Sequence, residues 1–268
     1  MATYVFSDVH GHFRTLDRLL ERVSPSVDDT IFMLGDMIDR GPEPIEVVKC
    51  CHELPNTTVL MGNHEDLMLS YYADPYDPGN QINWEINGAA PTQSGIRMLP
   101  PEERVELARW LFTLPLYAQT EVGGRRYLLV HAGIDPMNIP SLDVKTWDEQ
   151  AIEDMVGYQR RDDLMWIRED FWGVPTGLVD EHGQGPIVIA GHTPTAYLDY
   201  MADQPDRASK GPDGLCRMVR VGACEQTGGV ADRWDIDCGC AGGAGFGQLL
   251  MLRLDDEEEI YEPVREGE

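Results

Sequence analysis

The first seventy residues alternate short apolar runs with amphipathic stretches, a pattern that predicts strands and helices in turn. Gly41 and Pro42 mark a turn before the second amphipathic stretch. A β-α-β-α-β-α opening implies right-handed crossovers and a mainly parallel sheet covered by helices. The apolar runs cover residues 4–6, 31–34 and 59–61, and the helical apolar positions are Leu16, Leu19, Leu20, Val23, Ile45, Val47, Val48, Leu67, Met68 and Leu69.

The rest of the chain is less regular. Residues 74–101 are rich in Pro, Gly and Asn, which predicts an ordered excursion that lies over the core and caps or covers a site. A helix is expected at 102–112, followed by strand-like apolar runs at 126–130, 187–190, 217–221 and 248–254, with turn-rich loops at 203–214 and 225–233 that connect strands of a second sheet. The pattern predicts one α/β domain over residues 1–268, built as a sheet sandwich flanked by helices.

The composition and charge of the chain limit the classes of partner that we expect for it. A chain of 268 residues with 42% hydrophobic content can bury a full-sized core. Its 47 acidic and 21 basic residues give a net charge of −26, which repels nucleic acid and anionic lipid, so neither is an expected partner. No run of about 18 apolar residues offers a membrane span, and the candidate residue Asp8 leaves no room for a cleaved signal, so a cytoplasmic location is expected. The six cysteines lack CxxC spacing and are expected to be reduced thiols.

Polar clusters follow the three early apolar runs, where those strands are expected to end. An α/β sheet places its ligands just beyond the carboxyl ends of its strands. Because residues two apart in extended backbone project to one side, Asp8 and His10 are expected to face the same ion. The clusters are Asp8-Val9-His10-Gly11, Gly35-Asp36-Met37-Ile38-Asp39-Arg40-Gly41 and Gly62-Asn63-His64-Glu65.

Two later apolar runs end in histidine. Residues 128–130 lead into His131, and residues 187–191 lead into His192. The five strand ends supply imidazole, carboxylate and amide groups without a thiolate, a donor set that suits manganese, iron or zinc better than calcium or soft metals. Manganese is the first expectation, with iron and zinc as alternatives. Two such ions about 3.5–4 Å apart can clamp both oxygens of an in-line displacement and lower the pKa of bound water toward about 7.

The motifs DVHG, GDMIDRG and GNHE, followed by the histidines of LLVHAG and IAGHTP, resemble the phosphoprotein phosphatase family of metallophosphoesterases. They are most similar to its bacterial and phage branch. The motifs run from residue 8 to 192 in the family's order, and their joint occurrence is highly specific although each tetrapeptide alone is weak. The resemblance implies the calcineurin-like fold, a sandwich of two mixed sheets flanked by helices.

The resemblance also implies two divalent metal ions per chain. The first ion is then held by Asp8, His10 and Asp36. Asp36 is expected to bridge the two ions. The ligands implied for the second ion are Asp36, Asn63, His131 and His192.

The same resemblance implies the groups that handle the substrate. Arg40 and Arg168 match phosphate-binding arginines, which grip phosphate oxygens with a planar fork of donors, and Asn63 is expected to contact the substrate as well. His64 matches the general acid that protonates the leaving oxygen, with Asp39 orienting it and keeping it protonated.

Several other polar residues are expected to be structural. His12, His52 and His182 match no motif position and are expected on a helix surface or in a loop, although His12 is close to the site in sequence. The sequence Cys238-Gly239-Cys240 is interpreted as structural rather than metal-binding. After Cys240 many relatives carry a tyrosine and paired glycines, whereas this chain reads AGGAGF. That departure affects substrate contacts which the family makes there and leaves the expected metal ligands intact.

The leading functional hypothesis is a serine/threonine protein phosphatase that hydrolyses phosphorylated proteins or peptides, with some activity on phosphotyrosine, by direct attack of a metal-bound hydroxide. The alternative is a hydrolase of dinucleoside polyphosphates, from a branch of the same superfamily with nearly the same metal site. That branch often departs from the second motif, and the intact Asp39-Arg40-Gly41 favours the phosphatase. A non-catalytic phosphoprotein-binding module is the remote third hypothesis. The sequence predicts no oligomeric state.

Overall fold

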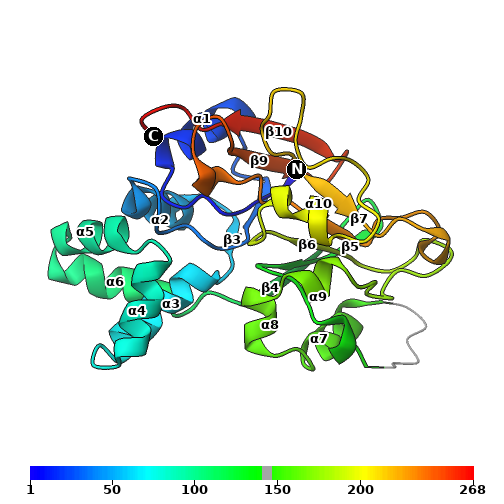
Figure 1. Cartoon of the computed structure of the whole chain (residues 1–268), viewed down its shortest axis with the longest axis horizontal. Coiled ribbons are helices and arrows are strands. Elements are labelled where there is room, and N and C mark those ends of the chain that lie inside the picture. Colours follow the sequence, from blue (N-terminus) through cyan, green and yellow to red (C-terminus); the bar gives the residue numbers. More distant parts are fainter. Residues whose placement is uncertain (141–146) are drawn as a thin grey trace.

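The computed structural model describes residues 1–140 and 147–268, which form two packed five-stranded sheets with helices outside them (Figure 1). The first sheet has the order β10-β9-β1-β2-β3. Its parallel strands are β1 (Thr3–Phe6), β2 (Thr30–Met33) and β3 (Thr57–Val59), and its antiparallel strands are β9 (Gln248–Arg253) and β10 (Glu258–Pro263).

The second sheet has the order β4-β5-β6-β8-β7. Here β5 (Arg125–Val130), β6 (Ile187–Ala190) and β8 (Arg233–Asp235) run parallel, and the antiparallel strands β4 (Tyr117–Val122) and β7 (Val219–Val221) form its edges. The predicted α/β sandwich of two mixed sheets flanked by helices is therefore confirmed.

Each central strand is buried on both faces. In β1, Val5 points into the core between the sheets, whereas Tyr4 and Phe6 pack under the helices outside the first sheet. In β5, Leu129 belongs to the same inter-sheet core, whereas Leu128 faces the helices outside the second sheet. Alternate residues of a strand point to opposite faces, so double-sided burial needs continuous apolar runs. Those runs made strands such as β1 and β5 visible in the sequence.

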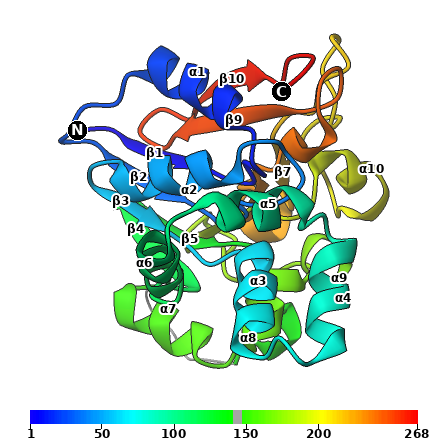
Figure 2. The same ribbon diagram turned by 90° about the vertical axis from the view of Figure 1, so that its left-hand side faces the viewer.

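The helices α1 (Phe13–Val23), α2 (Pro44–Glu53) and α3 (Asn63–Ala73) follow β1, β2 and β3 as predicted. Helix α1 buries Leu16 and Leu19 beneath a charged outer face and contacts β9 and β10 (Figure 2). The predicted helix at 102–112 is α6 (Pro101–Leu111). The second sheet is accompanied by α7 (Glu149–Val156), α8 (Arg161–Trp166), α9 (Glu169–Trp172) and α10 (Leu198–Met201). Short 3-10 turns occupy Pro136–Asn138, Thr195–Tyr197, Glu225–Thr227 and Cys240–Gly242.

Residues 74–101 contain two helices that the sequence did not predict, α4 (Pro78–Ile86) and α5 (Ala90–Met98). Their prolines suggested loop structure, but proline fits the first turn of a helix, where its missing N–H group costs no hydrogen bond. The Asp77 side chain caps α4 by accepting a hydrogen bond from Gly79 N–H at 2.8 Å. Contacts with α3 and α2 place the pair beside the first sheet (Figure 1).

Three strands were missed in the sequence. β4 and β10 lie at sheet edges and carry mixed polar and apolar residues, and β8 is short and contains the buried Arg233. The loops 203–214 and 225–233 do lead into β7 and β8 of the second sheet, as expected. Among the described residues, no helix has the length and apolar character needed to cross a membrane.

Candidate active site

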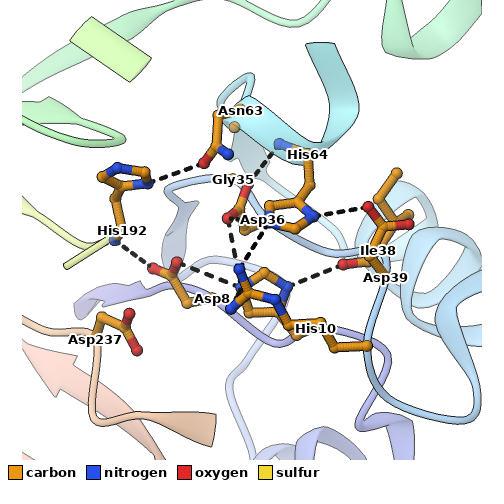
Figure 3. Close-up of polar contacts among 12 residues, drawn as sticks. Asp8, His10, Gly35, Asp36, Ile38, Asp39, Asn63, His64, His192 and Asp237 are labelled. Carbon is orange, nitrogen blue, oxygen red and sulfur yellow. Dashed lines mark hydrogen bonds and ion pairs between the residues drawn. The ribbon is translucent and has the colours of Figure 1, made fainter. Parts of the chain in front are cut away.

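The predicted site residues come together where the parallel strands of both sheets end (Figure 3). The loops after β1 and β2 carry Asp8 and Asp36, and α3 begins at Asn63 just after β3. His131 follows the last residue of β5, and His192 lies two residues beyond β6. Residues far apart in the sequence therefore meet at one edge, as ligands of an α/β sheet do.

One group of potential metal ligands contains His10, Asp36 and His64. His10 Nε2 lies 3.4 Å and His64 Nε2 lies 3.8 Å from Asp36 Oδ2. All three side chains are buried. Three donor atoms that face one another in this way form a potential cation site.

A second group contains Asp36, His131 and His192. His131 Nε2 lies 3.5 Å from Asp36 Oδ1, the oxygen that the first group does not use. Asn63 Oδ1 lies 2.9 Å from both His131 Nε2 and His192 Nδ1. The two oxygens of Asp36 therefore face different groups, an arrangement that suits a shared ligand.

Asp8 lies beside the first group, next to His10. Its Oδ1 lies 3.9 Å from His10 Nε2, and the group itself contains His10, Asp36 and His64. Ser7 Oγ and His192 N–H both donate to Asp8 Oδ2, the second at 3.0 Å. Asp8 therefore borders the group, while its Oδ1 is buried without a hydrogen-bond partner among the described residues.

The loops of the site are built in unfavourable backbone conformations. Positive φ angles are uncommon outside glycine, and clusters of them occur at functional sites. The surrounding structure must hold these residues in place, which fixes the direction of each side chain. The residues concerned are Asp8, His10, Asp36, Asp39, Arg40 and His192, with φ between 45° and 69°.

Two glycines allow the loops to approach closely. A Cβ atom on Gly62 would lie 2.3 Å from Asp36 Oδ1, and one on Gly191 would lie 2.0 Å from Asp8 Oδ2. Any larger residue at these positions would displace a carboxylate of the site. Steric crowding thus explains why the GNHE and IAGHTP motifs have glycine at these positions.

Backbone carbonyl groups orient two of the imidazoles. His10 Nδ1 lies 3.0 Å from the Ile38 carbonyl oxygen, and His131 Nδ1 lies 2.8 Å from that of Leu34. A carbonyl oxygen accepts from N–H, so Nδ1 carries the proton and Nε2 presents its lone pair to the site. This tautomer is the one that a metal ligand requires.

The electrostatic character of the site fits divalent cations. Burial raises the pKa values of Asp8 and Asp36 well above their usual range, and repulsion from neighbouring carboxylates adds to the effect. Burial also lowers the pKa of His131 to about 3 and keeps that of His192 well below its ordinary value. Neutral imidazoles can bind a metal, and a cation would stabilise the buried carboxylates in their ionised form. The donor set therefore suits the group that the sequence implied.

His64 and Asp39 form the expected pair. His64 Nδ1 donates to Asp39 Oδ2 at 2.7 Å, and Arg40 Nη2 lies 3.0 Å from His64 Nε2. Burial lowers the pKa of His64 although the hydrogen bond to Asp39 raises it. Asp39 thus orients the ring and favours its protonated form, against the opposite effect of burial.

The other predicted substrate residues surround this pair. Arg40 Nη1 lies 3.4 Å from His10 Nε2, so its guanidinium reaches the first group. Arg168 is half-buried at the start of α9, and its charge contributes to the lowered pKa values of His64, His131 and His192. Both arginines therefore place positive charge near the centre of an acidic protein, which favours an anionic ligand.

Glu65 was quoted within GNHE but was given no role in the sequence. It is fully buried, and its carboxylate accepts hydrogen bonds from the backbone N–H groups of Asp36, Met37 and Gly62 at 2.9, 2.9 and 3.1 Å. Its place three residues after Gly62, where its carboxylate accepts from Gly62 N–H at the start of α3, was the available signal. Glu65 ties the start of α3 to the loop that presents Asp36.

Asp235 and Asp237 were also missed, because β8 was not predicted. Both are buried, and Asp237 lies beside Asp8 (Figure 3). Burial raises the pKa of Asp237 to about 6. The strand end after β8 therefore joins the five that were expected.

The remaining candidates take varied positions. His12 is buried at the start of α1 rather than on a surface, and its pKa is lowered by burial. The His52 ring lies against that of Trp110, tilted by 50° with the ring centroids 4.5 Å apart. Cys238 and Cys240 are free and buried, which raises the pKa values of both thiols, as structural cysteines require.

Residues 1–219 match the family model of calcineurin-like phosphoesterases. A bis(5'-nucleosyl)-tetraphosphatase (symmetrical) from Salmonella paratyphi C is 30% identical over 98% of this chain and 95% of its own length. The chain belongs to the calcineurin-like phosphoesterase family. An enzyme of the same description from Paracidovorax citrulli is 34% identical over 139 residues, which span 51% of this chain and about half (45%) of that relative.

Solved structures share the fold at low sequence identity. A structure provisionally described as a diadenosine tetraphosphatase aligns with a TM-score of 0.58 at 18% identity, covering 99% of this chain and 95% of that one. A metallophosphoesterase from Sphaerobacter thermophilus aligns with a TM-score of 0.53 at 14% identity, covering 99% and 88%. A cold-active protein tyrosine phosphatase gives 0.51 at 18% identity, covering 97% and 78%. These likenesses concern the fold alone.

Proposed function

We propose that this protein is a metal-dependent hydrolase that cleaves dinucleoside polyphosphates symmetrically. The observation that carries the proposal is the 30% identity to a symmetrical bis(5'-nucleosyl)-tetraphosphatase over 95% of that enzyme's length. The two ligand groups that share Asp36 support it, because two ions held side by side suit displacement at a phosphate. This reverses the order of the two hypotheses that the sequence motifs favoured.

The geometry supports an assignment of residues to the two ions. We assign His10 and Asp36, with Asp8 beside them, to one ion, and the second group to the other. Bound cations polarise phosphate oxygens and activate water as a nucleophile. Manganese remains the proposed metal, with iron and zinc as alternatives for the same nitrogen and oxygen donors. The ligands assigned to the second ion are Asp36, Asn63, His131 and His192.

Two arginines are proposed to supply positive charge for the phosphate groups of the substrate. We assign Arg40 and Arg168 to the phosphate oxygens, since a guanidinium binds them with two parallel hydrogen bonds. Asn63 is assigned a substrate contact as well as a metal. His64, held by Asp39, is assigned to proton transfer to the leaving oxygen. A departing nucleoside diphosphate needs little such help, because a terminal phosphate has a pKa of about 6.

The products of diadenosine tetraphosphate hydrolysis test the proposal. With manganese added, chromatography of the reaction is expected to give ADP as the only adenine nucleotide, and an excess of EDTA is expected to stop its formation. Formation of ATP and AMP in equal amounts would overturn symmetrical cleavage. Absence of any nucleotide product would overturn the whole proposal.

A second candidate is the serine/threonine protein phosphatase that the motifs put first. The observation in its favour is the 2.7 Å hydrogen bond between His64 and Asp39, because an alkoxide, unlike a nucleoside diphosphate, must be protonated as it leaves. Its substrate is a phosphorylated protein or peptide. With a net charge of −26 on the chain, phosphopeptides with basic flanks should react faster, and added salt should reduce this advantage. A rate of phosphate release that depends neither on the charge of the flanking residues nor on the salt concentration would count against this candidate.

A further inference from the structure

The carboxylate of Asp39 is held from two sides, and only one of them is His64. On the other side, Trp84 of α4 donates its Nε1–H to Asp39 Oδ2 at 3.0 Å, with Oδ1 at 3.2 Å. Thr92 of α5 donates its hydroxyl to Asp39 Oδ1 at 2.6 Å. Asp39, Trp84 and Thr92 are all 0% exposed. The two helices of segment 74–101 therefore reach the pair through the back of Asp39.

The same segment also holds the backbone of the second motif. Asp39 N–H donates to Thr92 Oγ1 at 2.9 Å, and Arg40 N–H donates to the Gly88 carbonyl oxygen at 3.0 Å. Asp39 and Arg40 have φ angles of 69° and 65°, a conformation that costs energy and persists only when the surroundings enforce it. Segment 74–101 supplies part of that enforcement.

We propose that Trp84 and Thr92 are positioning residues for His64 and act through Asp39. A carboxylate has about four lone-pair directions, and the indole and hydroxyl hydrogens engage both oxygens, which leaves Asp39 Oδ2 directed at His64 Nδ1. Thr92 both donates to Asp39 and accepts from it, so its hydroxyl has a single orientation. The imidazole ring is thereby fixed with Nε2 toward the site. The consequence for catalysis rests on the proposed role of His64.

The indole of Trp84 packs in the core and also donates to Asp39. Its ring belongs to the core outside the first sheet and lies 5.3 Å from the ring of Tyr71. Trp172 shows that this protein can bury an indole with no partner for Nε1 among the described residues. A nitrogen placed on Asp39 therefore points to a role beyond packing.

Thr92 offers a matched pair of variants. Thr92→Val keeps the shape of the side chain and removes the hydroxyl, and Thr92→Ser keeps the hydroxyl. We expect Thr92→Val to lower kcat for phenyl phosphate about tenfold or more, because misplacing a catalytic group by an ångström can cost up to about 100-fold. The kcat for para-nitrophenyl phosphate, whose leaving group needs little protonation, should stay within about twofold. KM should not change for either ester, and Thr92→Ser should recover most of the loss.

Trp84→Phe tests the other hydrogen bond. The control is Trp234→Phe, which removes a buried indole that donates to the Ala231 carbonyl oxygen at 3.1 Å in the second sheet. We expect the same leaving-group-dependent loss in Trp84→Phe and none in Trp234→Phe. Equal losses on both esters in Trp84→Phe and Thr92→Val would overturn the inference, since they would indicate damage to the whole site.

A measurement without turnover separates this inference from the proposed function. In proton and nitrogen NMR of the full chain, His64 Nδ1–H should give a resolved downfield signal because it is buried and strongly hydrogen-bonded. The signal should shift or broaden in Thr92→Val and Trp84→Phe and remain in Trp234→Phe. An unchanged signal in both site variants would overturn the inference even in an active enzyme. Loss of the signal in them would support it even if the nucleotide assay failed.

Discussion

The two sheets contribute to the site in different ways. The loops after β1 and β2 hold Asp8 and Asp36 in strained backbone, and His64 N–H at the start of α3 donates to Asp36 Oδ1. The second sheet contributes the imidazoles of His131 and His192 after β5 and β6, and the carboxylate of Asp237 after β8. One half therefore supplies Asp36, which belongs to both ligand groups, and the proposed acid His64, and the other half completes one ligand group.

This difference predicts which parts of the site a single substitution should affect. Asp36 belongs to both ligand groups, whereas His131 belongs to one and His64 adds the pair with Asp39. A change at Asp36 should disable both halves. Changes at the other two residues should separate metal binding from proton transfer.

The largest expected effect is that of Asp36→Asn. The amide has one acceptor oxygen in place of two and no charge, so the two ions no longer share a ligand and the negative charge between them is lost. Loss of a group that merely supports a metal ligand costs about 10–100-fold, and loss of the shared ligand should exceed that on every substrate. Elemental analysis should find neither ion. Retention of two ions per chain would contradict the shared position of Asp36.

The next effect is that of His131→Asn, which should remove one ion and leave the other. His131 is fully buried and faces only the second group, so the His10 group should persist. Activity should fall by more than about 100-fold on all substrates, since a direct ligand matters more than its supports. His52→Asn, an exposed histidine beside Trp110, is the control and should retain both ions. Loss of both ions in His131→Asn would contradict the prediction that His131 serves only one of the two ligand groups.

A narrower effect is expected for His64→Asn. Proton transfer contributes about 10²–10⁴-fold, so phenyl phosphate hydrolysis should slow by that range. Hydrolysis of diadenosine tetraphosphate and para-nitrophenyl phosphate should slow less than about tenfold, because their leaving groups need little protonation. Steady-state kinetics on the three substrates measure the difference. Equal slowing of all three would argue that His64 acts as a metal ligand in the group with His10 and Asp36 rather than as an acid.

The smallest effect concerns stability rather than turnover. Glu65→Gln replaces an acceptor oxygen by an N–H₂ group that faces the backbone N–H donors of the Asp36 loop. An unpaired buried donor costs about 1–3 kcal/mol, and chemical denaturation should show a loss in that range. Glu103→Gln, on the exposed Lys49 ion pair, should change the midpoint far less. Equal midpoints for wild type and Glu65→Gln would show that the loops of the first half do not depend on this carboxylate.

The contrast between the halves also explains what the sequence could predict. Doubly buried strands such as β1 and β5 read as continuous apolar runs, and the dense motifs after β1 to β3 gave Asp36, Asn63 and His64 directly. β8 contains Arg233 within three residues, so no apolar run marked it, and Asp237 was missed with it.

Contacts between distant segments were the other limit. Trp84 and Thr92 lie in a stretch whose prolines and glycines resembled a loop, and only the fold brings them to Asp39. The burial that lowers the pKa of His64 is likewise a property of the whole site. The motif identified Asp39 as the partner of His64. It could not show how burial and the carboxylate oppose each other in setting the pKa of His64.

The central claim is that the shared-ligand site serves a dinucleoside polyphosphate. The most direct test compares kcat/KM for diadenosine tetraphosphate and a phosphoserine peptide in one manganese-loaded preparation. We predict that the nucleotide is preferred by more than about tenfold, which corresponds to about 1.4 kcal/mol of transition-state stabilisation. A tenfold preference for the peptide would contradict the claim and return the protein phosphatase to first place.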